Sequence, residues 1–108
     1  MSQDYPGEFE QMVLLSIMRL GERAYGVAVK DEMESVTGRS PSSGALYTTL
    51  DRMEKKGFLE SRAGDSSSER GGRPRRYLRL TPAGRELLTR SRSALLALWD
   101  GLEGALDG

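Results

Sequence analysis

Arginine side chains gather in one short stretch of the chain. Of the seven positions from Arg70 to Arg76, four are arginine, and glycine and proline occupy the others. The four are Arg70, Arg73, Arg75 and Arg76. Guanidinium groups bind phosphate oxygens, and a glycine-rich hairpin that carries them can follow a nucleic-acid backbone or reach into the minor groove. A basic run can also be a solvated loop that keeps a protein soluble, so the surrounding elements must decide between the two.

The distribution of charge points to the same part of the chain. There are 16 basic and 16 acidic residues, so the net charge is zero. Residues 1–38 carry 3 basic and 7 acidic residues, net −4; residues 39–80 carry 10 and 5, net +5; and residues 81–108 carry 3 and 4, net −1. A polyanionic partner would therefore dock on the middle third.

The residue types that are missing exclude most catalytic chemistry. The chain has no cysteine and no histidine. Their absence removes disulfides, the usual ligands of zinc, haem and iron–sulfur clusters, and the histidine of nucleophilic triads. Asp and Glu could hold a hard cation, but no stretch has the spacing of a calcium-binding loop. We therefore expect neither an enzyme nor a cofactor.

Nothing in the sequence indicates a membrane or an export signal. The longest apolar run, Met12 to Met18, contains Ser16 and is far too short to cross a bilayer. The segment before it is acidic, unlike a signal peptide. We expect a cytoplasmic protein.

Hydrophobic periodicity predicts four helices and one hairpin in a chain long enough for one domain. Helices are expected over residues 8–20, 25–36, 41–56 and 82–106, and strands over 58–62 and 75–80. Ser40-Pro41 and Thr81-Pro82 each supply a cap followed by proline, which opens the third and last helices. The residues between the strands, 63–74, are rich in serine and glycine and predict a loop. The order predicts a mainly α fold with a small β-hairpin wing, that is, a winged helix-turn-helix.

The second and third helices flank a short glycine-containing turn, which is the helix-turn-helix pattern. In that motif the second helix enters the major groove with its N-terminal residues at the base edges. The apolar face of the third helix consists of Leu46, Leu50 and Met53. By 100° steps the opposite face presents Gly44, Thr48, Asp51 and Lys55, flanked by Tyr47 and Arg52.

Small residues at the start of the third helix permit close approach of its backbone N–H groups to a phosphate. An ordinary surface helix would look the same, but the arginine-rich hairpin that follows it favours nucleic acid over a solvated loop. The candidate DNA contacts are Ser42, Ser43, Gly44, Tyr47, Thr48, Arg52, Lys55, Arg70, Arg73, Arg75 and Arg76.

The last helix carries two apolar stripes, more than one small domain needs. One consists of Leu88, Leu95, Trp99, Leu102 and Leu106, and the other of Leu87, Ala94, Leu98 and Ala105. We expect one stripe to pack on the domain and the other on a second copy, giving a homodimer. Trp99 fits interface packing, and it could also form a flat wall for an apolar ligand. Gly101 and Gly104 weaken the end of this helix.

Five stretches of the sequence resemble the PadR-like transcriptional regulators. They are GEFE at 7–10, AYGV at 24–27, GALYTTLDRMEKKG at 44–57, RGGRPRRY at 70–77 and YLRLTPAG at 77–84. Each is moderately specific, whereas all of them in this order and spacing are highly specific. The chain differs from many members in having one C-terminal helix in place of a larger helical domain, so it resembles a compact subgroup.

The resemblance implies a winged helix domain that dimerises through its last and first helices and binds near-palindromic operators, often as a repressor. It adds Phe9 and Met12 to the dimer residues Leu88, Leu95, Trp99, Leu102 and Leu106, where a small aromatic effector could bind. It implies a DNA-binding unit over residues 1–80 and a dimerisation helix over 81–108, joined in one compact unit. The alternative is a winged helix used for protein–protein contact without operator binding.

Overall fold

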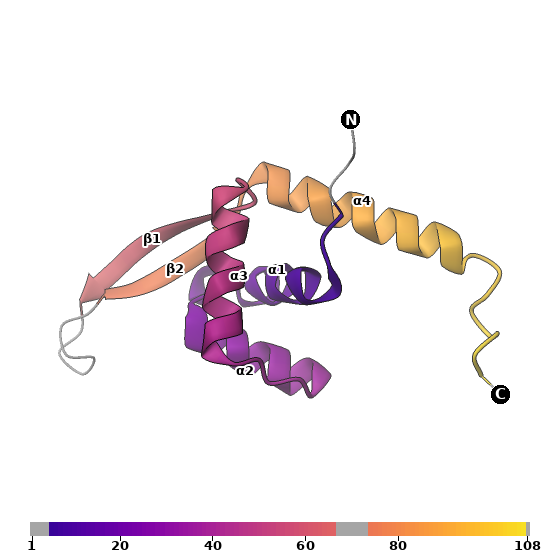
Figure 1. Ribbon diagram of the computed structural model, residues 1–108, viewed down its shortest axis with the longest axis horizontal. Coiled ribbons are helices and arrows are strands. Elements are labelled where there is room, and N and C mark those ends of the chain that lie inside the picture. The colour runs from indigo at the N-terminus through magenta and orange to yellow at the C-terminus, as the bar shows by residue number, and fades with distance from the viewer. Residues whose placement is uncertain (1–4, 67–73, 108) are drawn as a thin grey trace.

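The computed structural model describes residues 5–66 and 74–107. It contains α1 (Glu8–Leu20), the 3-10 turn η1 (Gly21–Arg23), α2 (Gly26–Thr37), α3 (Ser43–Lys55), β1 (Leu59–Ser66), β2 (Pro74–Leu80) and α4 (Pro82–Trp99). The first three helices form one body, the hairpin projects from it, and α4 runs along the body and past its edge (Figure 1). This is the predicted order of helices and hairpin.

The third helix begins two residues later than the sequence predicts. Ser42, rather than Ser40, is its cap: the Ser42 hydroxyl accepts a hydrogen bond from the Ala45 N–H at 3.1 Å. Ser40-Pro41 as the opening of α3 was therefore wrong. Both serines suit a cap. The chain leaves α2 through Gly38, which has a left-handed φ of 80°. Residues 39–42 then form the connection to α3, whose apolar face packs on the core.

The hairpin is longer than the alternating segments of the sequence. β1 and β2 pair antiparallel from Leu59↔Leu80 to Ala63↔Arg76, and after an irregularity Ser66 pairs with Pro74. The hydrogen bonds between the strands join backbone groups. The pairing therefore continues into residues whose side chains do not show the alternating pattern of a strand. The Leu78 N–H also donates to the Ala24 carbonyl at 2.8 Å, which ties the outer edge of β2 to the segment before α2.

One hydrophobic core joins the helices to the base of the hairpin. Its members are Val13, Leu14, Ile17, Ala24, Val29, Met33, Leu46, Leu50, Met53, Leu59, Leu78, Leu80, Leu87 and Leu88. The inward face predicted for the third helix is confirmed. In the part of the chain that the structure describes, no helix is long and apolar enough to span a membrane.

The last helix is shorter than predicted. It ends at Trp99, and Gly101 follows with φ 83°. A left-handed glycine just past a helix ends it, because the chain direction changes there. Leu102 and Leu106, predicted to lie on this helix, lie beyond its end.

Burial of α4 changes along the helix, not around it. Leu87 and Leu88 are 2% and 7% exposed, and the Ser91 hydroxyl donates to Gln11 of α1 at 3.1 Å. Helical steps continue this face to Leu95 and Leu98, which are 47% and 73% exposed. The expectation of one stripe for the domain and one for a partner was wrong. Both stripes are buried at the start of α4 and exposed toward its end, because α4 extends past the other helices (Figure 1).

Candidate nucleic-acid interface

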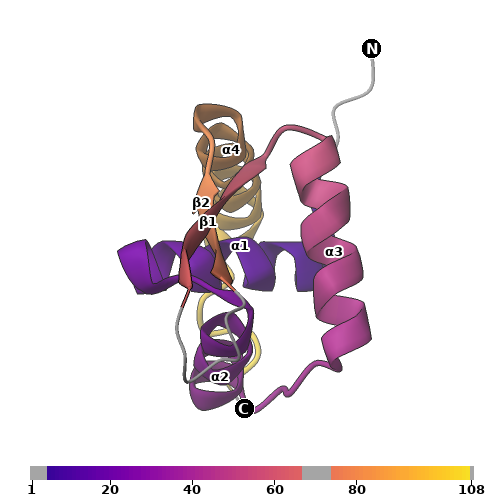
Figure 2. The same ribbon diagram turned by 90° about the vertical axis from the view of Figure 1, so that its left-hand side faces the viewer.

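The first turns of α3 are open to solvent. α3 stands along one side of the molecule with the hairpin beside it (Figure 2). Ser42, Ser43, Gly44 and Thr48 are exposed, as is Lys55 in the last turn. A Cβ added at Gly44 would meet no heavy atom within 4 Å. Nothing in the described chain therefore covers the backbone at the start of this helix.

Tyr47 lies across the start of α2. It remains 41% exposed, yet its hydroxyl is so close to Gly26 that a side-chain carbon there would overlap it. Gly26 is buried and is the first residue of α2. The missing side chain at Gly26 thus leaves room for the end of the Tyr47 side chain at the contact between α3 and α2.

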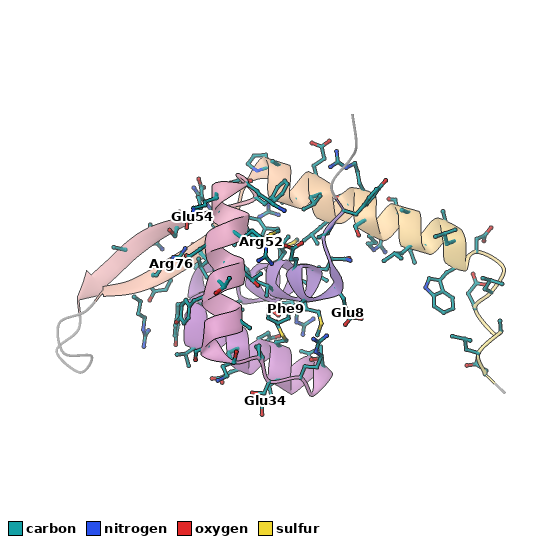
Figure 3. All side chains as sticks on the ribbon, in the orientation of Figure 1. Glu8, Phe9, Glu34, Arg52, Glu54 and Arg76 are labelled. Carbon is teal, nitrogen blue, oxygen red and sulfur yellow. The ribbon has the colours of Figure 1, made fainter. Side chains whose placement is uncertain are left out.

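The first turn of α1 holds the helix-turn-helix through two ion pairs. Glu10 accepts from Arg52 Nε at 2.9 Å, and Glu8 accepts from Arg39 Nη1 at 2.6 Å. Figure 3 shows Arg52 between α3 and α1. Partial burial acts to raise the pKa of Glu10, but the Gly7 N–H and Arg52 outweigh it and hold this pKa below its ordinary value. Arg52 is thus engaged by its own chain.

Arg76 joins the hairpin to α3. Its guanidinium donates to Asp51 Oδ1 at 3.0 Å and to Glu54 Oε1 at 2.6 Å, and the Ser61 hydroxyl donates to both oxygens of Glu54 at 3.0 and 2.9 Å. Hydrogen bonds from Arg76 and Ser61 lower the pKa of Glu54. Both carboxylates belong to α3, so this arginine also has partners within the chain.

The other face of the hairpin carries stacked aromatic and cationic groups. The guanidinium of Arg75 lies 4.2 Å from the ring centre of Tyr25, and that of Arg62 lies 5.0 Å from the ring centre of Tyr77. The two tyrosine rings meet edge to face at 5.7 Å. The Arg75–Tyr25 and Tyr25–Tyr77 contacts link β2 to the residue before α2, and the Arg62–Tyr77 contact joins the two strands. The two remaining predicted wing contacts, Arg70 and Arg73, lie outside the described residues.

A family model decides what kind of protein carries this geometry. The model described as "Transcriptional regulator PadR-like family" matches residues 14–90, most of the chain. The chain belongs to the PadR-like family of transcriptional regulators.

Individual relatives agree with this assignment. "Transcriptional regulator Rv3488" of Mycobacterium tuberculosis is 48% identical over 60 residues, which are 54% of this chain and 50% of that protein, so the match spans half of the relative's length. A PadR-like regulator from Bacillus cereus has a similar structure, with a TM-score of 0.73, 25% identity and coverage of 93% and 92% of the two chains. A PadR family regulator from Eggerthella lenta has a TM-score of 0.68, 28% identity and coverage of 93% and 87%. These structures confirm the winged helix fold.

Sequence reasoning missed the acidic partners in this PadR-like regulator. Glu8, Glu10, Asp51 and Glu54 each bind an arginine, and they were not among the candidate site residues. Asp51 and Glu54 are three apart on a helix, so the sequence does place them on one side. No pattern indicates that a strand arginine lies within reach, because that depends on how the hairpin folds back.

The residues predicted for a dimer or effector site separate into two groups. Leu88 is covered by its own chain, and Phe9 and Met12 are partly buried against the core. Leu95, Trp99, Leu102 and Leu106 are exposed. A cavity of about 490 Å³ lies elsewhere, between the end of α1, the base of the hairpin and the start of α4, and Trp99 does not line it.

Proposed function

We propose that this regulator is a sequence-specific DNA-binding repressor that acts as a homodimer on a near-palindromic operator. The uncovered first turn of α3 carries the proposal. Ser42, Ser43 and Gly44 leave the backbone at the start of α3 open to solvent. The hairpin beside it belongs to the middle third of the chain, which carries the net positive charge. The proposed base-edge and phosphate contacts are Ser42, Ser43, Gly44, Tyr47, Thr48 and Lys55, with Arg70, Arg73 and Arg75 on the DNA backbone.

The dimer is supported by the far half of α4. Leu95, Leu98 and Trp99 form an exposed apolar face that continues a buried one. A second copy that covers this face would remove it from water, and a two-fold pairing would present two α3 helices to successive major grooves, about 34 Å apart.

Selection of bound DNA from a random pool tests the proposal. We expect a motif with two-fold symmetry, whose affinity falls steeply with salt. A protein that selects no motif and shifts no duplex at low salt would instead be the protein–protein contact module.

The proposal includes a small aromatic effector that binds beside Trp99 in the dimer and relieves repression. Trp99 is the only tryptophan of the chain, so its fluorescence reports on this place alone. We expect planar aromatic compounds to quench it in a saturable way and to release DNA in the same concentration range. A broad panel that gives flat titrations would remove the effector from the proposal.

Gly44 allows a test in which folding and DNA binding move in opposite directions. Gly44→Ala adds a methyl where no neighbour stands within 4 Å. We expect the free energy of unfolding to rise by up to about 1 kcal/mol, because alanine favours a helix over glycine. We expect operator affinity to fall by about tenfold, because the methyl keeps the backbone from a phosphate.

Denaturant unfolding and gel shifts measure the two effects. Gly104→Ala is the matched control, since it also has open space around it but lies beyond α4. It should leave operator affinity unchanged. If Gly44→Ala binds DNA as tightly as the parent, the start of α3 does not approach the backbone.

A further inference from the structure

Two carboxylates of α3 hold the guanidinium of Arg76, a residue of the hairpin. We propose that Arg76 is a positioning residue, a clamp with Asp51 and Glu54 that sets the angle between the wing and α3. This inference rests on the proposed DNA-binding function and replaces the phosphate contact expected for Arg76 from the sequence.

The register of β2 directs Arg76 toward α3. Arg76, Leu78 and Leu80 alternate along the strand and therefore share a face, and both leucines are buried in the core. Arg76 lies further out on that face, beyond the edge of the core, where α3 passes beside it (Figure 3). Ser61 of β1 is paired with Leu78 on the same face and bonds to Glu54. Both strands of the hairpin thus contact one carboxylate of α3.

The geometry leaves the guanidinium little freedom to serve a phosphate. Its two terminal nitrogens bind different carboxylates, Nη1 to Asp51 and Nη2 to Glu54. A planar fork that spans two acceptors is held in one orientation, unlike a single exposed ion pair. If Arg76 left both acids to bind a phosphate, it would expose two negative charges next to the DNA.

The clamp has two consequences for DNA recognition. It fixes the hairpin relative to α3, the helix proposed to read bases. The hairpin and α3 can then bind the duplex together without the entropy cost of ordering one against the other. It also neutralises Asp51, a carboxylate that is exposed on the face of α3 opposite the core and would otherwise repel phosphates. The contacts of Tyr25 with Tyr77 hold the outer edge of β2 at the same time.

A double-mutant cycle on the full chain separates the clamp from a phosphate contact. Glu54→Gln removes a negative charge near the DNA, so electrostatics alone would tighten binding. The clamp predicts the reverse: Glu54→Gln and Arg76→Gln each weaken operator binding by about five- to tenfold, and the double variant is no weaker than either single one. Binding to unrelated DNA should not fall in Glu54→Gln, so discrimination between sequences declines.

The Glu60–Arg79 pair provides the matched control. It lies within the same hairpin, with Arg79 Nε at 2.7 Å from Glu60 Oε1, and in the described part of the chain this ion pair joins β1 to β2 and does not involve α3. Glu60→Gln should leave operator discrimination unchanged. Ser61→Ala, which loosens Glu54 without altering charge, should give a smaller loss in the same direction, and it serves if Glu54→Gln does not fold.

The outcomes distinguish failure of the clamp from failure of the function. If the parent protein binds no DNA, the proposed function fails and the clamp has nothing to position. If the parent binds an operator, but Glu54→Gln binds it as tightly or more tightly while Arg76→Gln weakens binding to all DNA alike, Arg76 is a phosphate contact and the inference is wrong.

Discussion

Leu98→Glu is expected to convert the regulator into a monomer and to lower its affinity for a two-half-site operator by about 100-fold or more. Leu98 is 73% exposed on the far half of α4, so the substitution should not disturb the core of the chain. In a dimer the same position would be buried, and an unpaired carboxylate in an apolar interface carries a large free-energy penalty. Loss of the second α3 helix then removes the gain from simultaneous binding of both half-sites.

Light scattering and gel shifts check the two parts of this expectation. A DNA with a single half-site should bind the variant and the parent similarly, because each α3 helix is intact. Ser93→Glu is the control, since it adds the same charge on the opposite side of α4, at an exposed position. If Leu98→Glu stays dimeric, the far half of α4 does not form the interface.

Gly84→Ala is expected to destabilise the fold by about 1–3 kcal/mol, the usual range for overpacking. Gly84 is buried in the first turn of α4, and a Cβ there would overlap the carbonyl group of Phe58. Thr81 fixes this approach: its N–H donates to the Phe58 carbonyl at 3.1 Å and its hydroxyl donates to the Gly57 carbonyl at 2.6 Å. Because backbone meets backbone, no side chain can rotate away to make room.

Thermal unfolding measures this effect, with a fall in Tm of about 5 °C or more for a domain of this size. Gly44→Ala is the comparison, because it also replaces a glycine in the first turn of a helix and is expected to stabilise. Helix propensity alone predicts that both substitutions stabilise. Equal or higher stability of Gly84→Ala would mean that α4 does not pack this closely on the corner before β1.

Local patterns in the sequence predicted most of the fold. The inward face of α3, with Leu46, Leu50 and Met53, follows from residue spacing, and so does the order of helices and strands. Residue spacing did not determine where α3 begins, because Ser40 and Ser42 both suit an N-cap. In the structure Ser42 is the cap. Likewise Gly101 ends α4 although leucines continue the pattern beyond it.

Residue type alone did not indicate the partners of two candidate arginines. Arginines were identified as phosphate contacts because of their charge, yet Arg52 and Arg76 are bound by Glu10, Asp51 and Glu54. The planar fork of a guanidinium matches the geometry of both carboxylate and phosphate. Which of the two it meets depends on elements that are 22 to 42 residues away in the chain.

The sequence by itself determined which face of each element is apolar, where the positive charge lies and which residue types are missing, since these follow from composition and from the spacing of neighbouring residues. Only the tertiary structure decided how far that apolar face of α4 is covered, which arginines already have partners, and why Gly84 has no room for a side chain. Those features arise where segments distant in the chain meet, and periodicity within one segment carries no information about what it packs against.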